Sequence, residues 1–463
     1  MSQTSQAGSG DAAAERTARL LSDPPLKTML TLGLPTIIVV MTQILVGIIE
    51  TYWTSRLGTD SLAGVTLVAP LTALMTTMSN GGIGGGVSSS IARALGARDT
   101  ERANQLLWHA VIIALGFGLA FTVGVITLGP LLYGALGGEG RVLEQALIYS
   151  AWVFGGSVPL WLMNLLSSAM RGSGDVKFPA TISLIGAAVT VPLSPALIFG
   201  WGPLPAMGVG GAGAAVLIFY LGAVAALVRR LTHGGAGLTL KVTPLKSDAF
   251  AAILGVGLIS ALGTILANLT TVFVTGAVGL AGGAVLAGYG VASRIDFLLI
   301  PLLFGFATAV VTVVGLATGA GNLARAREAA WKAGALAFAV TQAVGLIVAL
   351  FPQAWMGVFS KDPEVIAAGS AYLQVAAPAY GAFGLGLMLY FASQGLGKVQ
   401  WPLVAGVSRL LVAGGGSWLL AAQLGGVIGP GAAVALGSLV FGAINAFGFW
   451  RVSRPKRATT SDT

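Results

Sequence analysis

The sequence lacks the residues that several common kinds of site require. It contains no cysteine, which excludes disulfide bonds and cysteine-ligated metals. Its only histidines, His109 and His233, are too few and too far apart to predict a metal site. There is no GxxxxGK[ST] loop for ATP and no HExxH zinc motif. We therefore expect no metal, no ATP site and no other cofactor.

Charge is also scarce, at 9% of the 463 residues, whereas soluble domains carry roughly a quarter charged residues. Hydrophobic residues make up 55%, and apolar runs of about 20 residues, long enough to cross a bilayer, recur along the chain. The first 28 residues are polar and lack the apolar core of a removable signal peptide. We predict twelve membrane spans, at about 29–54, 62–92, 104–134, 143–170, 178–200, 208–228, 251–277, 284–318, 331–351, 365–393, 401–422 and 430–450.

The basic residues are distributed unevenly between the two sides of these spans. Most arginines and lysines precede span 1, follow span 12 or lie in the connections after even-numbered spans. Only Arg56, Arg141 and Lys361 lie on the opposite side. This bias predicts that both termini are cytoplasmic, in the cell inner membrane. The net charge of +9 is thereby explained as a topology signal, and no nucleic-acid partner is expected.

The chain contains an internal repeat. The stretch Tyr149–Pro179 returns at Tyr372–Pro402, a shift of about 223 residues, and Arg102 and Trp108 return at the same shift as Arg325 and Trp331. We call spans 1–6 copy one and spans 7–12 copy two. The predicted fold is all-α and polytopic, with twelve transmembrane helices in two pseudo-symmetric six-helix lobes, the architecture of a carrier. The predicted parts are a cytoplasmic segment 1–28, an amino-terminal lobe 29–228, a cytoplasmic linker 229–250, a carboxy-terminal lobe 251–450 and a cytoplasmic tail 451–463.

Glu50 is the first candidate for ion coupling, because it and Asp296 are the acidic residues predicted well inside spans. A charge in hydrocarbon is expensive, so it faces a cavity, pairs or takes up a proton. A buried carboxylate without a partner can exchange a proton near neutral pH, as a proton-coupled carrier requires. Gln43 lies two turns earlier on the same helical face. Alternatively, Glu50 lies at the membrane interface or pairs with Arg56.

Two further polar groups are predicted inside spans. In span 5, Thr190 and Ser194 lie beside Pro192 and Pro195, which free backbone carbonyls at mid-membrane and indicate either a binding site or a simple kink. Copy two contains a set of polar residues that either forms a structural charge network or takes part in transport. Its members are Asn268, Arg294, Asp296 and Arg409.

Seven stretches of the sequence are characteristic: LPTIIVVMTQ at 34–43, ETYWTSRLGTDSLAGV at 50–65, IARALGARD at 91–99, RGSGDVKFP at 171–179, YGVASRIDFLLIP at 289–301, GLATGAGN at 315–322 and QGLGKVQWP at 394–402. Taken together, they resemble the multidrug and toxic compound extrusion (MATE) transporters, and the similarity covers about residues 32–451. The resemblance implies two six-helix lobes around a cleft and antiport of organic cations against protons or sodium ions.

The resemblance also bears on single residues. Glu50 stands where prokaryotic members typically have an aspartate, and Gln43 and Asn164 match polar positions of the amino-terminal lobe. We expect Gln43, Asn164, Thr190 and Ser194 to line the substrate cavity. Members similar to this chain usually have an asparagine and an aspartate where Thr190 and Ser194 stand. A sodium site needs several hard oxygen ligands, so these replacements favour protons over sodium as the coupling ion.

We therefore predict an ion-coupled antiporter rather than an enzyme. Its partners would be the lipid bilayer and small cationic or amphipathic molecules, and we expect a monomer. A flippase for a lipid-linked or amphipathic substrate is an alternative, although only Arg294 and Arg409 are embedded to hold a pyrophosphate. A membrane-embedded transferase is an alternative of another class, but no paired acids for magnesium are found in any span.

Overall fold

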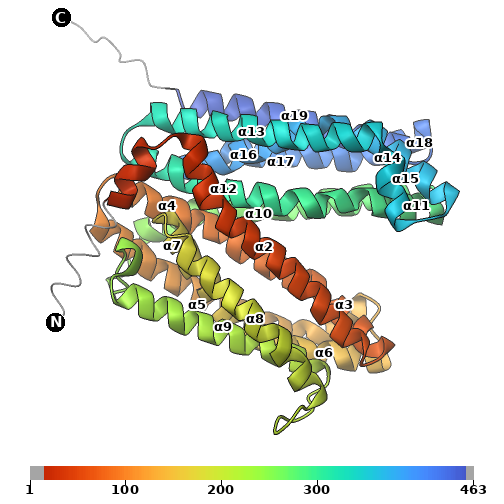
Figure 1. Ribbon diagram of the computed structural model, residues 1–463, viewed down its shortest axis with the longest axis horizontal. Helices are drawn as coiled ribbons and strands as arrows, with labels where there is room; N and C mark the ends of the chain where they lie inside the picture. The colour runs from red at the N-terminus through yellow and green to blue at the C-terminus, as the bar shows by residue number, and fades with distance from the viewer. Residues whose placement is uncertain (1–14, 455–463) are drawn as a thin grey trace, which may run out of the picture. The chain divides into compact units, whose positions relative to one another are not determined.

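The computed structural model describes residues 15–454, except for the side chains at positions 235 and 296–298 (Figure 1). Every regular element in this part of the chain is a helix. Eleven helices are long and apolar enough to cross a membrane, and a bent pair of shorter helices supplies the twelfth span. The all-helical, twelve-span prediction is confirmed.

Each span of copy one corresponds to one helix or to a run of helices without an intervening loop. Spans 2 and 4 are the interrupted ones, the first by a π-helical turn and the second by a bend of 44°. The elements are α2 Pro25–Ser55, α3 Thr59–Thr77, η1 Met78–Ile83, α4 Gly84–Gly96, α5 Thr100–Ala135, α6 Gly140–Gly155, α7 Ser157–Gly172, α8 Lys177–Phe199 and α9 Val209–Thr232.

Copy two repeats this order with two additions that the sequence did not predict, a short helix, α14, and a π-helical turn, η5, in span 11. Pro352 opens α14, in the first helical turn where a missing N–H costs nothing. The elements are η2 Gly235–Gly237, α10 Ser247–Gly279, α11 Gly283–Ala292, η3 Ser293–Ile295, α12 Asp296–Gly319, α13 Leu323–Leu350, α14 Pro352–Phe359, α15 Pro363–Ala376, η4 Ala377–Ala379, α16 Tyr380–Leu396, α17 Gln400–Arg409, η5 Leu410–Gly415, α18 Gly416–Leu424 and α19 Ile428–Val452.

The turns before the third span of each copy have the same hydrogen bonds. Asp99 begins α5 and Asn322 begins α13, and each side chain accepts the backbone N–H of the arginine three residues later. These caps satisfy backbone donors that a helix start leaves free. The residues before the caps, Arg98 and Gly321, both have left-handed backbones, with φ of 61° and 73°. The sequence repeat is therefore also a repeat of backbone geometry.

The fourth spans repeat each other as well. The N–H of Asp175 donates to the carbonyl of Met170, and the N–H of Lys398 donates in the same way to the carbonyl of Ser393. Both turns pass through a left-handed glycine, which is the usual way to end a helix. When the sequences of the two copies are aligned, the bend between α6 and α7 corresponds to the 3₁₀ turn η4. A short break in the fourth span is thus common to both copies.

Contacts divide the chain into two compact units. The first consists mainly of Leu34–Leu95 and Asp99–Leu258, and the second of Leu20–Gly33, Gly96–Arg98 and the chain from Ile259 onward. The first turns of α2 and of α10 thus belong to the unit formed mainly by the other copy. The domain limits given by the sequence, 1–28, 29–228, 229–250, 251–450 and 451–463, stay predictions.

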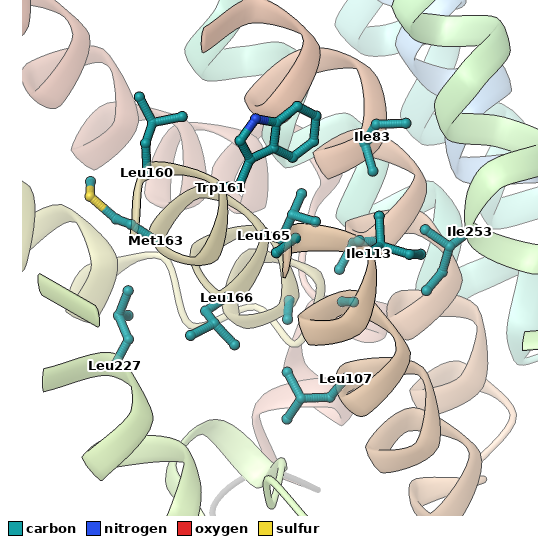
Figure 2. Packing of buried hydrophobic residues seen from close by; sticks show 14 of the residues in the cluster. Ile83, Leu107, Ile113, Leu160, Trp161, Met163, Leu165, Leu166, Leu227 and Ile253 are labelled. Atoms are coloured by element: carbon teal, nitrogen blue, oxygen red, sulfur yellow. The ribbon is translucent and has the colours of Figure 1, made fainter. Parts of the chain in front are cut away.

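The first unit has a well-packed apolar core around α7 (Figure 2). Trp161 is fully buried, and its ring stacks on Phe117 with centroids 5.0 Å apart. Close helix contacts depend on glycine, since a Cβ on Gly84 would lie 2.5 Å from the hydroxyl of Ser168. This core fixes the helices that carry the polar residues described next.

Candidate functional site

Glu50 lies near the carboxyl end of α2 and forms a hydrogen bond to α8. The hydroxyl of Ser194 donates to Oε2 of Glu50 over 2.8 Å. Ser194 is fully buried, and Thr190, one turn earlier on α8, is 3% exposed. The structure therefore joins two of the residues that the sequence singled out, Glu50 and Ser194, by a direct hydrogen bond. α8 continues as one helix through Pro192 and Pro195, so the site is not formed by a broken helix.

The second carboxylate oxygen of Glu50 is buried and has no hydrogen-bond partner among residues 15–454. No salt bridge to Glu50 is found in that part of the chain, so the alternative pairing with Arg56 is not observed. A buried charge is costly unless it is paired. Oε1 is consequently placed to accept a proton or to bind a cation.

Two tyrosines extend this polar site. The hydroxyl of Tyr149 on α6 lies near enough to Glu50 to interact with it electrostatically, and Tyr149 interacts likewise with Tyr220 on α9. Sequence reasoning treated Tyr149 only as a marker of the repeat and did not single out Tyr220. The position of a tyrosine in the sequence does not show which neighbouring helix its hydroxyl contacts, so the sequence contains little indication of this role.

The face of α2 that leads to Glu50 is open. Gln43 is exposed two turns before Glu50. Gly47 lies between them on the same face, and a Cβ added there would have no atom within 4 Å. Gln43 therefore stays a predicted cavity residue, with space beside it.

Asn164 belongs to a different polar cluster from Glu50. Its amide donates to the hydroxyl of Ser79 over 2.7 Å. Arg171, on the same helix α7, donates to Asn80 Oδ1 over 2.7 Å and to Ser168 Oγ over 2.6 Å. Ser79 and Asn80 lie in the π-helical turn η1, a feature that re-aims side chains and is frequent at functional sites. The placement of Asn164 in a substrate cavity stays a prediction.

The polar residues predicted in copy two have separate contacts. Asn268 is exposed and donates to the Thr264 carbonyl of its own helix. Arg294 lies over the ring of Phe359, and Arg409 lies over the ring of Phe383 at 4.7 Å. The side chain of Asp296 lies outside the described residues. The network of these four residues therefore stays a prediction.

Metal-binding groups are not evident around these residues. Among the described side chains of residues 15–454, no three His, Asp or Glu groups are close enough together to hold an ion. A sodium ion at Glu50 would need further oxygen ligands, such as hydroxyl or carbonyl oxygens.

The chain is similar to known transporters over most of its length. An FAD transporter from Shewanella oneidensis is 26% identical over 96% of this chain and 98% of its own. A probable multidrug resistance protein NorM from Thermotoga maritima is 25% identical over 73% of each chain. A solved transporter of the MOP superfamily from Pyrococcus furiosus, whose reported pocket polarity suggests a different function, is 25% identical with a TM-score of 0.85, covering 94% of this chain and 97% of that one.

The family model is the decisive comparison. The MatE model matches residues 35–196 and 260–417, one match in each copy and more than half of the chain in total. A solved outward-facing MATE family transporter has the same fold, with a TM-score of 0.85 at 25% identity over 94% of this chain and 97% of that one. The chain therefore belongs to the MatE family, a family of membrane transporters rather than of enzymes.

Proposed function

We propose that the protein is a secondary active exporter that exchanges organic cations for protons, with Glu50 as the coupling carboxylate. The observation that supports this most is the buried Oε1 of Glu50, which has no partner in the described part of the chain. A buried carboxylate without a partner is stabilised when it binds a cation or a proton. The same oxygen cannot bind both at once. That competition is what an antiporter needs.

The proposed cycle uses one carboxylate and one proton. Ionised Glu50 keeps the hydrogen bond from Ser194 on Oε2 and binds a cation from the cytoplasmic side at Oε1. A proton from outside then binds Oε1, neutralises the charge and releases the cation. The proton leaves to the cytoplasm when the site faces inward again. Such alternation is general for carriers made of two repeats.

We also infer the cellular location and the oligomeric state of the protein. The bias of basic residues supports a multi-pass protein of the cell inner membrane with cytoplasmic termini. We expect it to act as a monomer on small cationic or amphipathic molecules, without any cofactor other than the coupling ion.

The coupling ion can be tested in reconstituted vesicles. A fluorescent organic cation should accumulate when an outward proton gradient is imposed without sodium. A sodium gradient at equal pH should produce no accumulation. Accumulation driven by sodium alone would contradict proton coupling, and no accumulation under either gradient would contradict antiport.

A second candidate is export of a flavin dinucleotide. It is favoured by the FAD transporter of Shewanella oneidensis, which aligns over nearly all of both chains. Arg171, held by Asn80 and Ser168 inside the first unit, would supply a positive charge for such an anion. Arg171→Gln introduces the residue that copy two has at the matching position, Gln394. Loss of FAD efflux with intact cation export in this variant would favour the second candidate.

A further inference from the structure

We infer that Trp53 and Glu50 together select organic cations that carry a hydrogen-bond acceptor near the charged atom. This inference rests on the proposed function, since it assumes that Glu50 binds the cation. It makes Trp53 a specificity-determining residue and narrows the substrate class from cations in general to cations with a nearby ester, amide, ether or ring nitrogen.

Trp53 contributes a buried donor close to a buried acceptor. Its indole Nε1 and the Oε1 of Glu50 are both buried, and neither has a hydrogen-bond partner among residues 15–454. Glu50 and Trp53 are three positions apart on α2, so their Cβ atoms lie on one face about 5–6 Å apart. Buried polar groups almost always find a partner. Two such atoms within one helical turn point to a common external partner.

The chemistry of the two atoms defines that partner. A carboxylate oxygen can only accept or attract positive charge, and an indole N–H can only donate. One molecule satisfies both when its cation lies at Oε1 and an acceptor lies about one helical turn away at Nε1. A cation without an acceptor would leave the buried N–H unsatisfied, at a cost of the order of 1 kcal/mol or more.

Neighbouring aromatic rings fix the direction of the indole. Trp53 packs edge-to-face against Phe199, with centroids 6.0 Å apart, and against Trp201 at 6.4 Å. Phe199 follows Ser194 on α8, so one helix holds both the carboxylate and the indole. Groups held in place before binding lose little freedom when the ligand arrives.

The surface of α2 is unobstructed one turn before Glu50. The position of a Cβ on Gly47 is open, one turn before Glu50. Copy two offers no counterpart of the pair. When the left-handed glycines Gly58 and Gly282 are aligned, Val274 replaces Glu50 and Ala277 replaces Trp53, and both replacements are buried.

The test uses two probes of the same shape. Benzoylcholine carries an ester close to its quaternary nitrogen, and phenylbutyltrimethylammonium replaces the ester by methylenes. Each competes with export of a fluorescent cation by the full chain in vesicles. The wild type should bind benzoylcholine roughly fivefold more tightly, the effect of one neutral hydrogen bond. Equal affinities in the wild type would overturn the inference, whatever the variants do.

Two matched substitutions locate the donor. Trp53→Phe keeps the ring and removes the N–H, so the preference should fall to about equal affinities while phenylbutyltrimethylammonium binds as before. Trp450→Phe makes the same change at an exposed tryptophan of copy two and should leave the preference intact. A preserved preference in Trp53→Phe, or its loss in Trp450→Phe, would overturn the inference. Trp53→Tyr, which restores a donor, should recover part of it.

Glu50→Gln separates this inference from the proposed function. It should weaken both probes equally, because it removes the charge that both share. If Glu50→Gln exports and binds as the wild type does, the proposed function fails. If Glu50→Gln is inactive while Trp53→Phe keeps the ester preference, only the role of Trp53 fails.

Discussion

The two copies share their turns and caps but differ where copy one holds its carboxylate. Ser194 of copy one aligns with Ser417 of copy two, and both are fully buried. The hydroxyl of Ser194 donates to Glu50, whereas that of Ser417 donates to the carbonyl of Ala413 in its own span. At the position of Glu50, copy two has Val274, which is 2% exposed. Ser417 thus bonds to the backbone of its own span, as serines in helices often do, whereas Ser194 bonds to a carboxylate on a neighbouring helix.

This difference shows that the bond between a carboxylate and a buried serine in copy one is not repeated at the aligned positions of copy two. The aligned tyrosines agree with this view. Tyr149 of copy one interacts with Glu50, whereas Tyr372 of copy two packs edge-to-face against Tyr289 at 5.0 Å. The two copies differ at only a few side chains in this region. Substitutions at aligned positions can therefore test whether copy one alone couples transport to protons.

The largest effect is expected for Glu50→Gln. Removing one member of a buried charge pair costs about 2–5 kcal/mol, so cation affinity should fall at least roughly 30-fold. Proton-driven export of a fluorescent cation should be lost while the protein still inserts and remains folded. Glu144→Gln, the same change at an exposed residue, is the control and should export normally. Undiminished export by Glu50→Gln would contradict the assignment of Glu50 as the coupling carboxylate.

Val274→Glu places the carboxylate of copy one into copy two. The site there is apolar, and Ser417 is already bonded within its own span, so the charge has no ready donor. Unfolding free energy should fall by about 3 kcal/mol, the scale of a charge at the centre of a membrane helix. Thermal unfolding in detergent measures it, with Val274→Leu as the control. Rescue of Glu50→Gln by Val274→Glu would show that the copies are interchangeable.

Ser194→Ala and Ser417→Ala form a pair of smaller effects. A hydrogen bond to a charged group contributes about 1.5–3 kcal/mol, so Ser194→Ala should weaken cation binding roughly tenfold or more. Ser417→Ala removes only a bond within one span and should leave binding unchanged. Cation titrations of both variants in detergent decide this, and equal effects would mean that the difference between the copies has no role in binding.

The smallest effect is expected for Gly47→Leu. A Cβ at this position would have no atom within 4 Å, so the side chain can extend beside Glu50 and stability should hardly change. Bulky cations should be exported a few-fold more slowly, whereas small ones should be exported normally. Export rates for a series of tetraalkylammonium ions measure this. Uniform rates across the series would show that this face of α2 does not line the substrate path.

Most of the fold could be predicted from the sequence. All twelve spans correspond to helices, because runs of about 20 apolar residues leave few other structures in a membrane. The π turns at Met78–Ile83 and Leu410–Gly415 and the short helix α14 were not predicted. Apolar spacing along one helix does not reveal a π turn, whereas the proline at the start of α14 was a local signal for a new helix.

The site was predictable only in part. Glu50 stood out because a carboxylate inside a span is rare, and Ser194 because it lies beside prolines. The bond of Asn164 to Ser79, rather than to Glu50, depends on how α7 faces the π turn. Tyr149, Tyr220 and the indole N–H of Trp53 acquire a role only from their neighbours in space. None of them differs in sequence from an ordinary aromatic residue of a membrane helix.

The most direct test of a lone exchangeable carboxylate is proton release on cation binding. Purified protein in weakly buffered detergent is mixed with a saturating organic cation, and the pH change is recorded with a dye. The wild type should release a proton as the cation replaces it on Glu50, and Glu50→Gln should release none. Unchanged proton release by Glu50→Gln would place the exchange on another group and contradict the account.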